Sequence, residues 1–192
     1  IRAELLSGNK DEARKFCGFS DDKPVVLIIG GSLGAAAVND AVRKILPQLL
    51  PKYNVIHLCG KGKLDESLKG TAGYVQYEYI KKELADLFAL ADVVISRAGA
   101  NAICELLALK KPNILIPLPA AASRGDQILN ANSFKKQGFS EVIDEEKITD
   151  DLLLETINNV YNNRSKYVEA MEKSPQQNGV EAVISLIKEV TK

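Results

Sequence analysis

The stretch VVLIIGGSLG, residues 25–34, decides the fold class. Its first half is a short, uninterrupted run of β-branched and aliphatic residues, as expected for a strand that is buried on both faces of a sheet. Its second half is a glycine-rich turn that leads into a helix-like segment. A buried strand, a tight turn and a helix together form the repeating unit of a parallel sheet.

The same rhythm runs through the middle of the chain. Further short apolar runs predict strands, and helix-like segments lie between them. Right-handed crossovers join such strands into one doubly wound, parallel α/β sheet, here of about six strands. The expected strands are Val25–Ile29, Asn54–Leu58, Val75–Tyr79, Val93–Ser96, Ile114–Ile116 and Glu141–Ile143, and the expected helices are Ala35–Leu50, Lys63–Leu68, Lys82–Leu90, Asn101–Leu109 and Gln127–Gln137.

Both ends of the chain differ from this pattern. Residues 1–22 are interpreted as a lead-in helix or linker, and residues 23–163 as the main domain. After Glu145 the pattern is helical, with amphipathic segments at Ile148–Tyr161 and Gly179–Val190 and a polar stretch between them. Residues 164–192 are interpreted as a helical tail. Because the chain begins at Ile1 rather than Met, we expect it to be a piece of a longer protein.

Composition disfavours several classes of protein. The 192 residues contain 25 Lys and Arg and 25 Asp and Glu, and this zero net charge argues against a nucleic-acid binder. A single histidine, His57, argues against a histidine-rich metal site, and its sequence neighbourhood favours a structural role over a catalytic one. Three separated cysteines indicate reduced, mostly buried thiols of a cytosolic protein. No apolar run reaches the roughly 20 residues of a membrane span.

Ligands of a doubly wound sheet bind beyond the carboxyl ends of its strands. There, the glycine-rich turn at residues 30–34 offers backbone N–H groups and a helix start to an anion. The turn is not GxGxxG and no GK[ST] follows, so neither a dinucleotide-binding nor a P-loop signature fits. The alternative is a plain strand-to-helix turn in which Ser32 only caps the helix.

Three further places carry candidate binding groups. A small-residue turn at residues 96–100 opens a helix that carries Glu105, about 9 Å along the axis, where a ribose would lie if a diphosphate capped the helix. Alternatively, Glu105 is a solvated or salt-bridged helix residue. Asp126 and Gln127 follow a long loop and supply polar groups for sugar hydroxyls. An equally good interpretation of Asp126 is that it only caps the helix. An exposed backbone edge beside Ile80 would recognise a planar nucleobase.

Together, the segments GGSLGA, HLCGKG, SRAGANAICELLALKKPNILIPLP and SRGDQILNANSFKKQGFSEVID closely resemble, in this order, the carboxyl-terminal half of the MurG family of N-acetylglucosaminyltransferases. The resemblance covers nearly the whole chain. It implies a Rossmann-like half of a two-domain GT-B fold that binds UDP-N-acetylglucosamine for peptidoglycan synthesis. A missing amino-terminal domain would hold the lipid-linked muramoyl-pentapeptide acceptor at the cytoplasmic face of the membrane, and the helical tail would pack on that domain.

The resemblance also implies roles for individual residues. Positions that contact the donor in the family are matched here by Arg2, Ser32, Ile80, Ala100, Asn101, Ala102, Glu105, Asp126 and Gln127. The implied partners are the diphosphate for Ser32 and the helix start at 100–102, uracil for the Ile80 backbone, the ribose for Glu105, and sugar hydroxyls for Asp126 and Gln127. Other members carry His or Gln in place of Asp126.

The implied reaction is inverting, since an acceptor hydroxyl displaces UDP from the anomeric carbon. It needs no metal or other cofactor, because a helix amino terminus can neutralise the leaving diphosphate. The proposed base belongs to the missing half, so no catalytic residue is assigned here and the fragment alone is expected to be inactive.

Three alternatives compete with this interpretation. The first is a stand-alone donor-binding subunit of a two-chain N-acetylglucosaminyltransferase, which the arginine-bearing opening segment disfavours. The second is a related GT-B enzyme, such as a glycolipid glycosyltransferase or a nonhydrolysing epimerase, which the DQ…NA pattern disfavours. The third is a redox Rossmann domain, which the missing GxGxxG disfavours.

Overall fold

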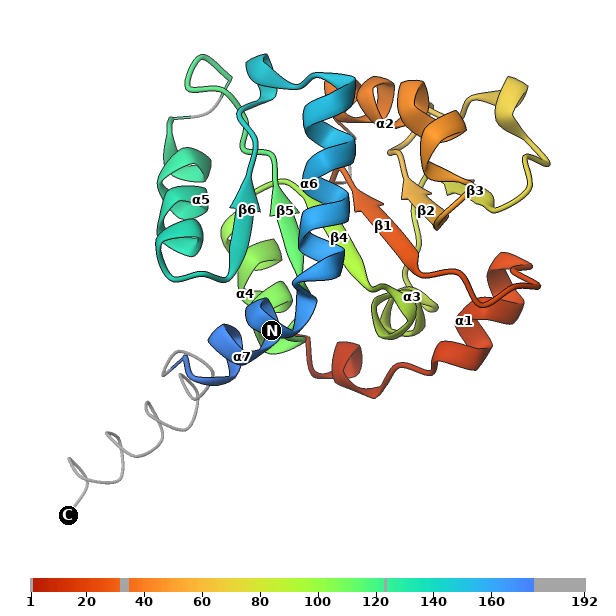
Figure 1. Cartoon of the computed structure of the whole chain (residues 1–192), viewed down its shortest axis with the longest axis horizontal. Helices are drawn as coiled ribbons and strands as arrows, with labels where there is room; N and C mark the ends of the chain where they lie inside the picture. Colours follow the sequence, from red (N-terminus) through yellow and green to blue (C-terminus); the bar gives the residue numbers. More distant parts are fainter. Residues whose placement is uncertain (1, 32–34, 123, 175–192) are drawn as a thin grey trace.

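The computed structural model describes residues 2–31, 35–122 and 124–174, and these residues form a single six-stranded sheet covered by helices (Figure 1). All neighbouring strands are parallel, and their order is β3-β2-β1-β4-β5-β6. The predicted doubly wound parallel sheet is therefore confirmed. The strands are β1 (Val25–Ile29), β2 (Asn54–Leu58), β3 (Tyr74–Tyr77), β4 (Val93–Ser96), β5 (Asn113–Leu115) and β6 (Ser140–Val142).

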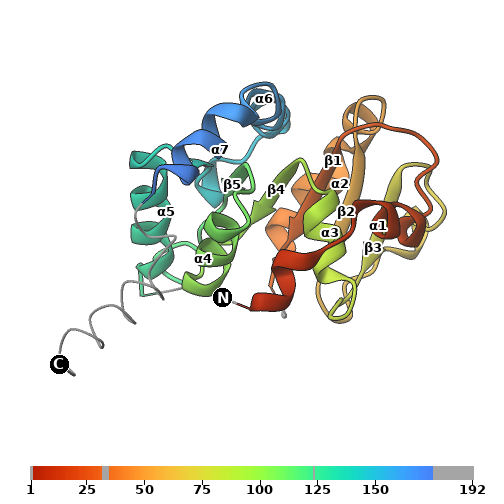
Figure 2. The same ribbon diagram turned by 90° about the horizontal axis from the view of Figure 1, so that it is seen from below.

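Helices cover both faces of the sheet. The α2 helix packs against α6 on one face, and α3 and α4 lie on the other (Figure 2). The helices are α1 (Lys10–Cys17), α2 (Ala36–Leu49), α3 (Leu84–Leu90), α4 (Ala100–Ala108), α5 (Asp126–Lys136), α6 (Asp150–Asn162) and α7 (Arg164–Glu172), with 3₁₀ turns η1 (Ala3–Ser7), η2 (Glu66–Leu68) and η3 (Glu145–Lys147). In the central strand β1, residues 25–28 have no solvent exposure. A continuous aliphatic sequence suits a central strand, because the side chains on both faces of the sheet pack against a layer of helices.

The predicted helix at Lys63–Leu68 is wrong, since only the three-residue turn η2 forms there. The backbone N–H of Asp65 donates to Gln76 Oε1 at 3.0 Å, and Gln76 Nε2 donates to the Asp65 carbonyl at 2.6 Å. The Asp65 carboxylate in turn accepts from the N–H and hydroxyl of Ser67. These bonds fix the segment to the edge strand β3 in place of a regular helix.

The lead-in segment is part of the domain rather than a loose linker. Leu5, Ala13, Cys17 and Phe19 are all buried, and both η1 and α1 pack along α3. Asn9 caps α1 by accepting hydrogen bonds from the backbone N–H groups of residues 11 and 12. The segment therefore has a fixed place on the sheet's helix layer.

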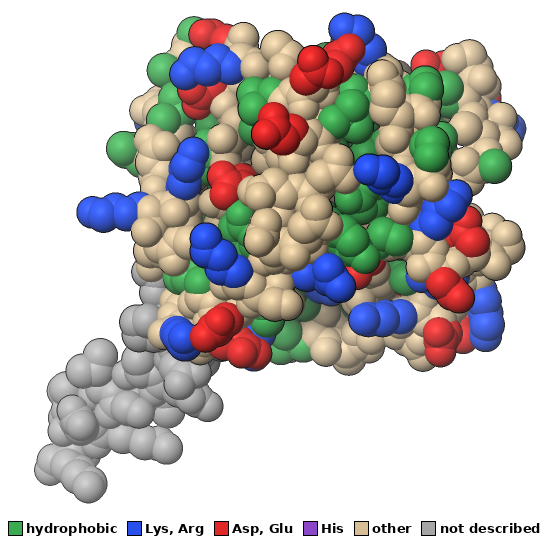
Figure 3. Space-filling view, in the orientation of Figure 1, with side chains coloured by type: hydrophobic (Ala, Val, Ile, Leu, Met, Phe, Trp, Pro, Cys, Tyr) green, Lys and Arg blue, Asp and Glu red, His purple; other side chains and the backbone are tan. Residues whose placement is uncertain are grey.

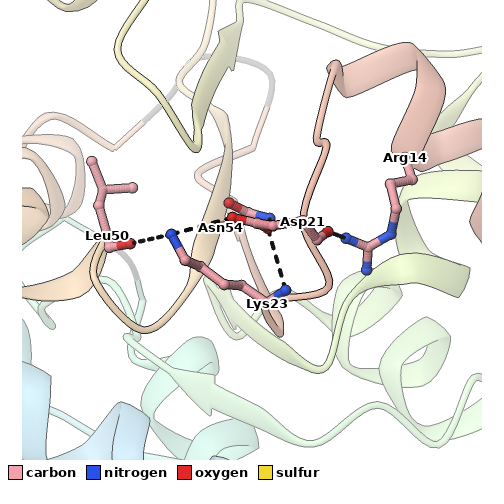
Figure 4. Close-up of polar contacts among 5 residues, drawn as sticks. All are labelled: Arg14, Asp21, Lys23, Leu50 and Asn54. Atoms are coloured by element: carbon pink, nitrogen blue, oxygen red, sulfur yellow. Dashed lines mark hydrogen bonds and ion pairs between the residues drawn. The ribbon is translucent and has the colours of Figure 1, made fainter.

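Asp21 anchors the break between this segment and β1 (Figure 4). Its carboxylate accepts from Asn54 Nδ2 at 2.7 Å and pairs with Lys23 Nζ at 3.2 Å. The bond from Asn54 is the main reason that the pKa of Asp21 is lowered. Arg14 donates to the Asp21 carbonyl, and Lys23 Nζ donates to the Leu50 carbonyl at 3.2 Å. These contacts tie α1, the end of α2 and the start of β2 together.

The polar stretch after α6, at the start of the predicted helical tail, forms the helix α7. Tyr167 and Met171 of this helix are buried, and the Tyr167 hydroxyl donates to Glu141 Oε1 at 2.8 Å. Burial raises the pKa of Tyr167 above its usual range. The described part of the expected tail thus packs on this domain. The predicted helix at Gly179–Val190 lies outside the described residues.

Charged side chains of both signs are mixed on the face shown in Figure 3, as a balanced composition leads one to expect. Within the described ranges, no helix combines the length and the apolar character needed to cross a bilayer. The cysteines there are unpaired thiols, with Cys17 and Cys59 buried and Cys104 exposed, which confirms reduced and mostly buried thiols.

Candidate functional site

A cavity of about 600 Å³ lies where β1 and β4 end side by side. From this point the chain winds outward in both directions, through β2 and β3 on one side and through β5 and β6 on the other, so the cavity occupies the topological switch point. Its volume suits a small molecule. It is lined by Ile29, Gly30, Gly31, Ser96, Arg97, Gly99, Ala100, Asn101, Ala102, Leu118 and Gln127.

Two features make this cavity suitable for an anion. The helix α4 starts there with Gly99 as its N-cap, and no side chain caps it. The first-turn N–H groups of a helix have no partner within it, and the helix dipole adds positive potential. Gly31, which also lines the cavity, has φ +85°, a left-handed conformation that favours glycine. The predicted group Ala100, Asn101 and Ala102 lines the cavity together with Gly30 and Gly31.

Gln127 reaches the same cavity from the start of α5. Its Oε1 accepts a hydrogen bond from the backbone N–H of Leu118 at 3.1 Å, so the amide orientation is set by the loop that follows β5. The Nε2 group keeps two N–H donors for a ligand. Asn130, one turn further along α5, donates to the Ala98 carbonyl at 3.0 Å and ties α5 to the turn before α4.

Glu105 forms a bidentate ion pair with Arg2, although the two residues are 103 positions apart in the sequence. Arg2 Nε lies 2.9 Å from Oε1, and Arg2 Nη2 lies 3.1 Å from Oε2. This bonding raises the pKa of Arg2 above its usual value. Glu105 stands four residues after Asn101 on α4, hence on the same helix face as the cavity wall. Both views show the start of η1 near α4 (Figures 1 and 2).

Of the predicted residues that the structure describes, four are not among those that line the cavity, namely Arg2, Ile80, Glu105 and Asp126. Ser32 lies outside the described residues. Ile80 is buried just after β3, and its neighbour Tyr79 is close enough to Arg2 to contribute to the raised pKa of Arg2. Asp126 is exposed at the first position of α5. The reading of Asp126 as a helix cap is wrong, because Gly125, with φ +83°, occupies the cap position.

Arg97 is a cavity residue that the sequence analysis did not select. Its guanidinium donates to the Ile116 carbonyl at 3.0 Å and forms an ion pair with Glu145, across the ends of β5 and β6. Arg97 therefore braces the loops behind the cavity. Its position directly after β4 is the sequence feature that places Arg97 at the ligand-binding end of the sheet.

His57 lies away from the cavity in a buried polar network. Its Nε2 is 2.8 Å from Asn39 Oδ1, and its Nδ1 is 3.0 Å from the Tyr74 hydroxyl. Asn39 Nδ2 donates to the Cys59 carbonyl at 2.8 Å, so the network joins α2 to β2 and β3. Burial lowers the pKa of His57 to about 3. This neutral, fully buried imidazole has the structural role that the sequence favoured.

Residues 25–187 match the glycosyltransferase family 28 C-terminal domain. The chain belongs to this family. It is 59% identical over 192 residues to a UDP-N-acetylglucosamine–N-acetylmuramyl-(pentapeptide) pyrophosphoryl-undecaprenol N-acetylglucosamine transferase of Lachnospira eligens, covering 100% of this chain and 54% of that protein. It is 62% identical over 190 residues to the protein of that name in Lachnoclostridium phytofermentans, covering 99% of this chain and 54% of the relative.

A solved structure of Acinetobacter baumannii MurG is also similar to this family 28 domain. The TM-score is 0.73 and the identity is 26%, over 97% of this chain and 55% of that one. These comparisons confirm the resemblance seen in the sequence motifs. The chain spans about half the length of the curated relatives it matches. Among the described residues, no three His, Cys, Asp or Glu side chains converge as a metal site would require.

Proposed function

We propose that this family 28 domain binds UDP-N-acetylglucosamine as the donor half of an inverting N-acetylglucosaminyltransferase of peptidoglycan synthesis. The observation that carries the proposal is the cavity at the switch point, which is lined by both Gly30 and Gly31 and the uncapped start of α4. Relatives whose names state this transfer are about 60% identical to the whole chain, which supports the choice of donor.

The proposed donor lies along α4. Its diphosphate takes the N–H groups at residues 100–102, whose positive potential also stabilises the charge on UDP as it leaves. The ribose hydroxyls donate to Glu105, and the Nε2 group of Gln127 donates to a sugar hydroxyl. Ser32 and Asp126 remain proposed contacts, and the backbone of Ile80 is the proposed reader of uracil.

The acceptor and the base would come from a second domain, since the curated relatives are about twice as long as this chain. The proposed acceptor is the lipid-linked muramoyl-pentapeptide, and the complete protein would work at the cytoplasmic face of the membrane. The undecaprenol in the relatives' names supports this placement. The chain alone should transfer no sugar, because it would not hold the nucleophile near the donor. Measurable transfer by this chain alone would contradict that expectation.

Calorimetric titration of the chain with UDP-N-acetylglucosamine, UDP, UDP-glucose and NADH tests the donor assignment. We expect binding of the uridine nucleotides, with UDP-N-acetylglucosamine preferred over UDP-glucose, and none of NADH. No binding of UDP at millimolar concentration to the folded chain would overturn the proposal.

A matched pair of variants at Ala100 tests the position of the diphosphate. Ala100→Asp puts a carboxylate at the helix start, where it is compatible with the helix dipole but repels the phosphates. We expect it to weaken UDP binding by at least about 30-fold. Ala100→Ser has a similar size without the charge and should bind nearly as wild type does. Equal binding by both variants would place the diphosphate elsewhere.

A further inference from the structure

The ion pair between Arg2 and Glu105 joins the opening segment of the chain to the cavity helix. Both guanidinium bonds are within hydrogen-bonding distance, at 2.9 and 3.1 Å, and they use both carboxylate oxygens. The Glu105 side chain is 13% exposed, whereas that of Arg2 is 48% exposed. The carboxylate is thus held in a fixed plane, while the arginine stays at the surface.

The opening segment is itself seated firmly enough to hold Arg2 in this place. Leu5, three residues further on, is 3% exposed, and the N–H of Asn9 donates to Asp86 Oδ1 at 2.7 Å on α3. Gly8 meets α3 so closely that an added Cβ would lie 2.0 Å from the Ala85 carbonyl oxygen. Arg2 therefore reaches Glu105 from a segment that is packed on the domain.

The geometry leaves Glu105 able to accept further bonds. A carboxylate offers about four lone-pair positions, two on each oxygen, and the arginine uses one on each. One acceptor position remains on each oxygen, and two neighbouring hydroxyls, such as a ribose cis-diol, can each donate to one of them. A planar guanidinium that donates one hydrogen bond to each carboxylate oxygen is the arrangement that best fixes the orientation of the carboxylate.

We propose that Arg2 is a positioning residue, which orients Glu105 for the ribose hydroxyls rather than contacting the phosphates of the donor. This inference rests on the proposed function of the site. It replaces the direct donor contact that the resemblance implies for Arg2 with an indirect one. A carboxylate that is already oriented avoids the loss of conformational entropy that an unpaired glutamate side chain would undergo when the ligand binds.

The test is calorimetric titration of the whole chain with UDP and with 2′,3′-dideoxy-UDP. Wild type should bind UDP about 10- to 100-fold more tightly than the dideoxy analogue. Arg2→Met should lower UDP affinity about 3- to 30-fold and leave dideoxy-UDP affinity unchanged. Arg2→Lys, which keeps the charge but loses the planar fork, should lie between them. In a Glu105→Ala background, Arg2→Met should have no further effect.

Each result separates this inference from the proposed function. If Arg2→Met weakens UDP and dideoxy-UDP equally, or adds its full effect to Glu105→Ala, Arg2 contacts the phosphates and the inference is overturned while donor binding stands. If wild type binds both nucleotides equally, the ribose role of Glu105 and this inference are both wrong. The proposal that the domain binds the donor would still stand. If wild type binds neither, the proposed function itself fails.

Discussion

The contact of Gly8 with α3 gives a prediction that can be worked out from the structure. In Gly8→Ala, the new methyl group would lie 2.0 Å from the carbonyl oxygen of Ala85 and 2.9 Å from the Cβ of Ala89. Ordinary contact begins at 3.4 Å, so the two backbones must separate by about 1.4 Å, the difference between 3.4 and 2.0 Å. Ala85 lies inside a helix and cannot yield, so the opening segment has to lift away from α3.

The main loss on lifting is the burial of Leu5, which is 3% exposed. Exposing a leucine side chain costs about 2–3 kcal/mol. Replacing glycine by alanine restricts the unfolded chain and offsets about 0.4–1 kcal/mol of this loss. The net destabilisation of roughly 1–2.5 kcal/mol should lower the Tm of a domain of this size by roughly 2–10 °C.

Thermal unfolding followed by circular dichroism measures this change. Leu6→Ala is the matched control, because Leu6 is on the same turn but 62% exposed, and its loss should stay within about 0.5 kcal/mol. Gly8→Ala should also reduce the preference for UDP over its dideoxy analogue, as is expected for Arg2→Met. A Tm equal to that of wild type would refute the reasoning, since the segment would then not be seated on α3.

Three other variants test separate parts of the structure. Gln127→Ala should weaken UDP-N-acetylglucosamine about 2- to 10-fold and leave UDP nearly unchanged in calorimetry, and equal losses would move Gln127 away from the sugar. Burial lowers the pKa of His57 from 6.5 to about 3, so between these values the unfolded chain binds a proton that the folded chain does not. Stability should therefore fall by about 1.4 kcal/mol per pH unit as the pH drops from 6.5, and urea unfolding of His57→Gln should lack this slope. Met171→Ala should lower the free energy of unfolding by about 2–5 kcal/mol, because the Met171 side chain has no solvent exposure. Leu152→Ala, at a 38% exposed site, is the control and should cost far less. Similar urea midpoints for the two variants would show that α7 does not pack on the domain.

The parts of the fold that could be predicted from the sequence are those in which local pattern and burial agree. Three strands, including the central β1, form over the predicted residues, because apolar runs buried on both faces have no competing interpretation. The bounds of α7 could not be predicted in this way, although the tail was expected to be helical. Its buried side chains, Tyr167 and Met171, lie in a mostly polar stretch that marks neither the start nor the end of a helix.

The candidate site divides along the same line. The glycine-rich turn and the start of α4 follow strands, so the rule for parallel sheets places them together at the switch point. The pairing of Arg2 with Glu105 has no local signal, because the two residues are 103 positions apart and meet only through the seating of the opening segment on α3. Arg97 was not selected because its partners, the Ile116 carbonyl and Glu145, belong to other strands' loops.

The central place of β1 has a consequence for how the chain folds during synthesis. Residues 25–29 pair with 54–58 on one side, and these can join as soon as the first half has emerged. The other edge of β1 waits for residues 93–96. Until then an aliphatic strand presents an open row of backbone donors and acceptors, which is the form that pairs with other chains. A chain that ends near residue 90 should therefore self-associate through β1, whereas one that includes β4 closes this edge within the same molecule.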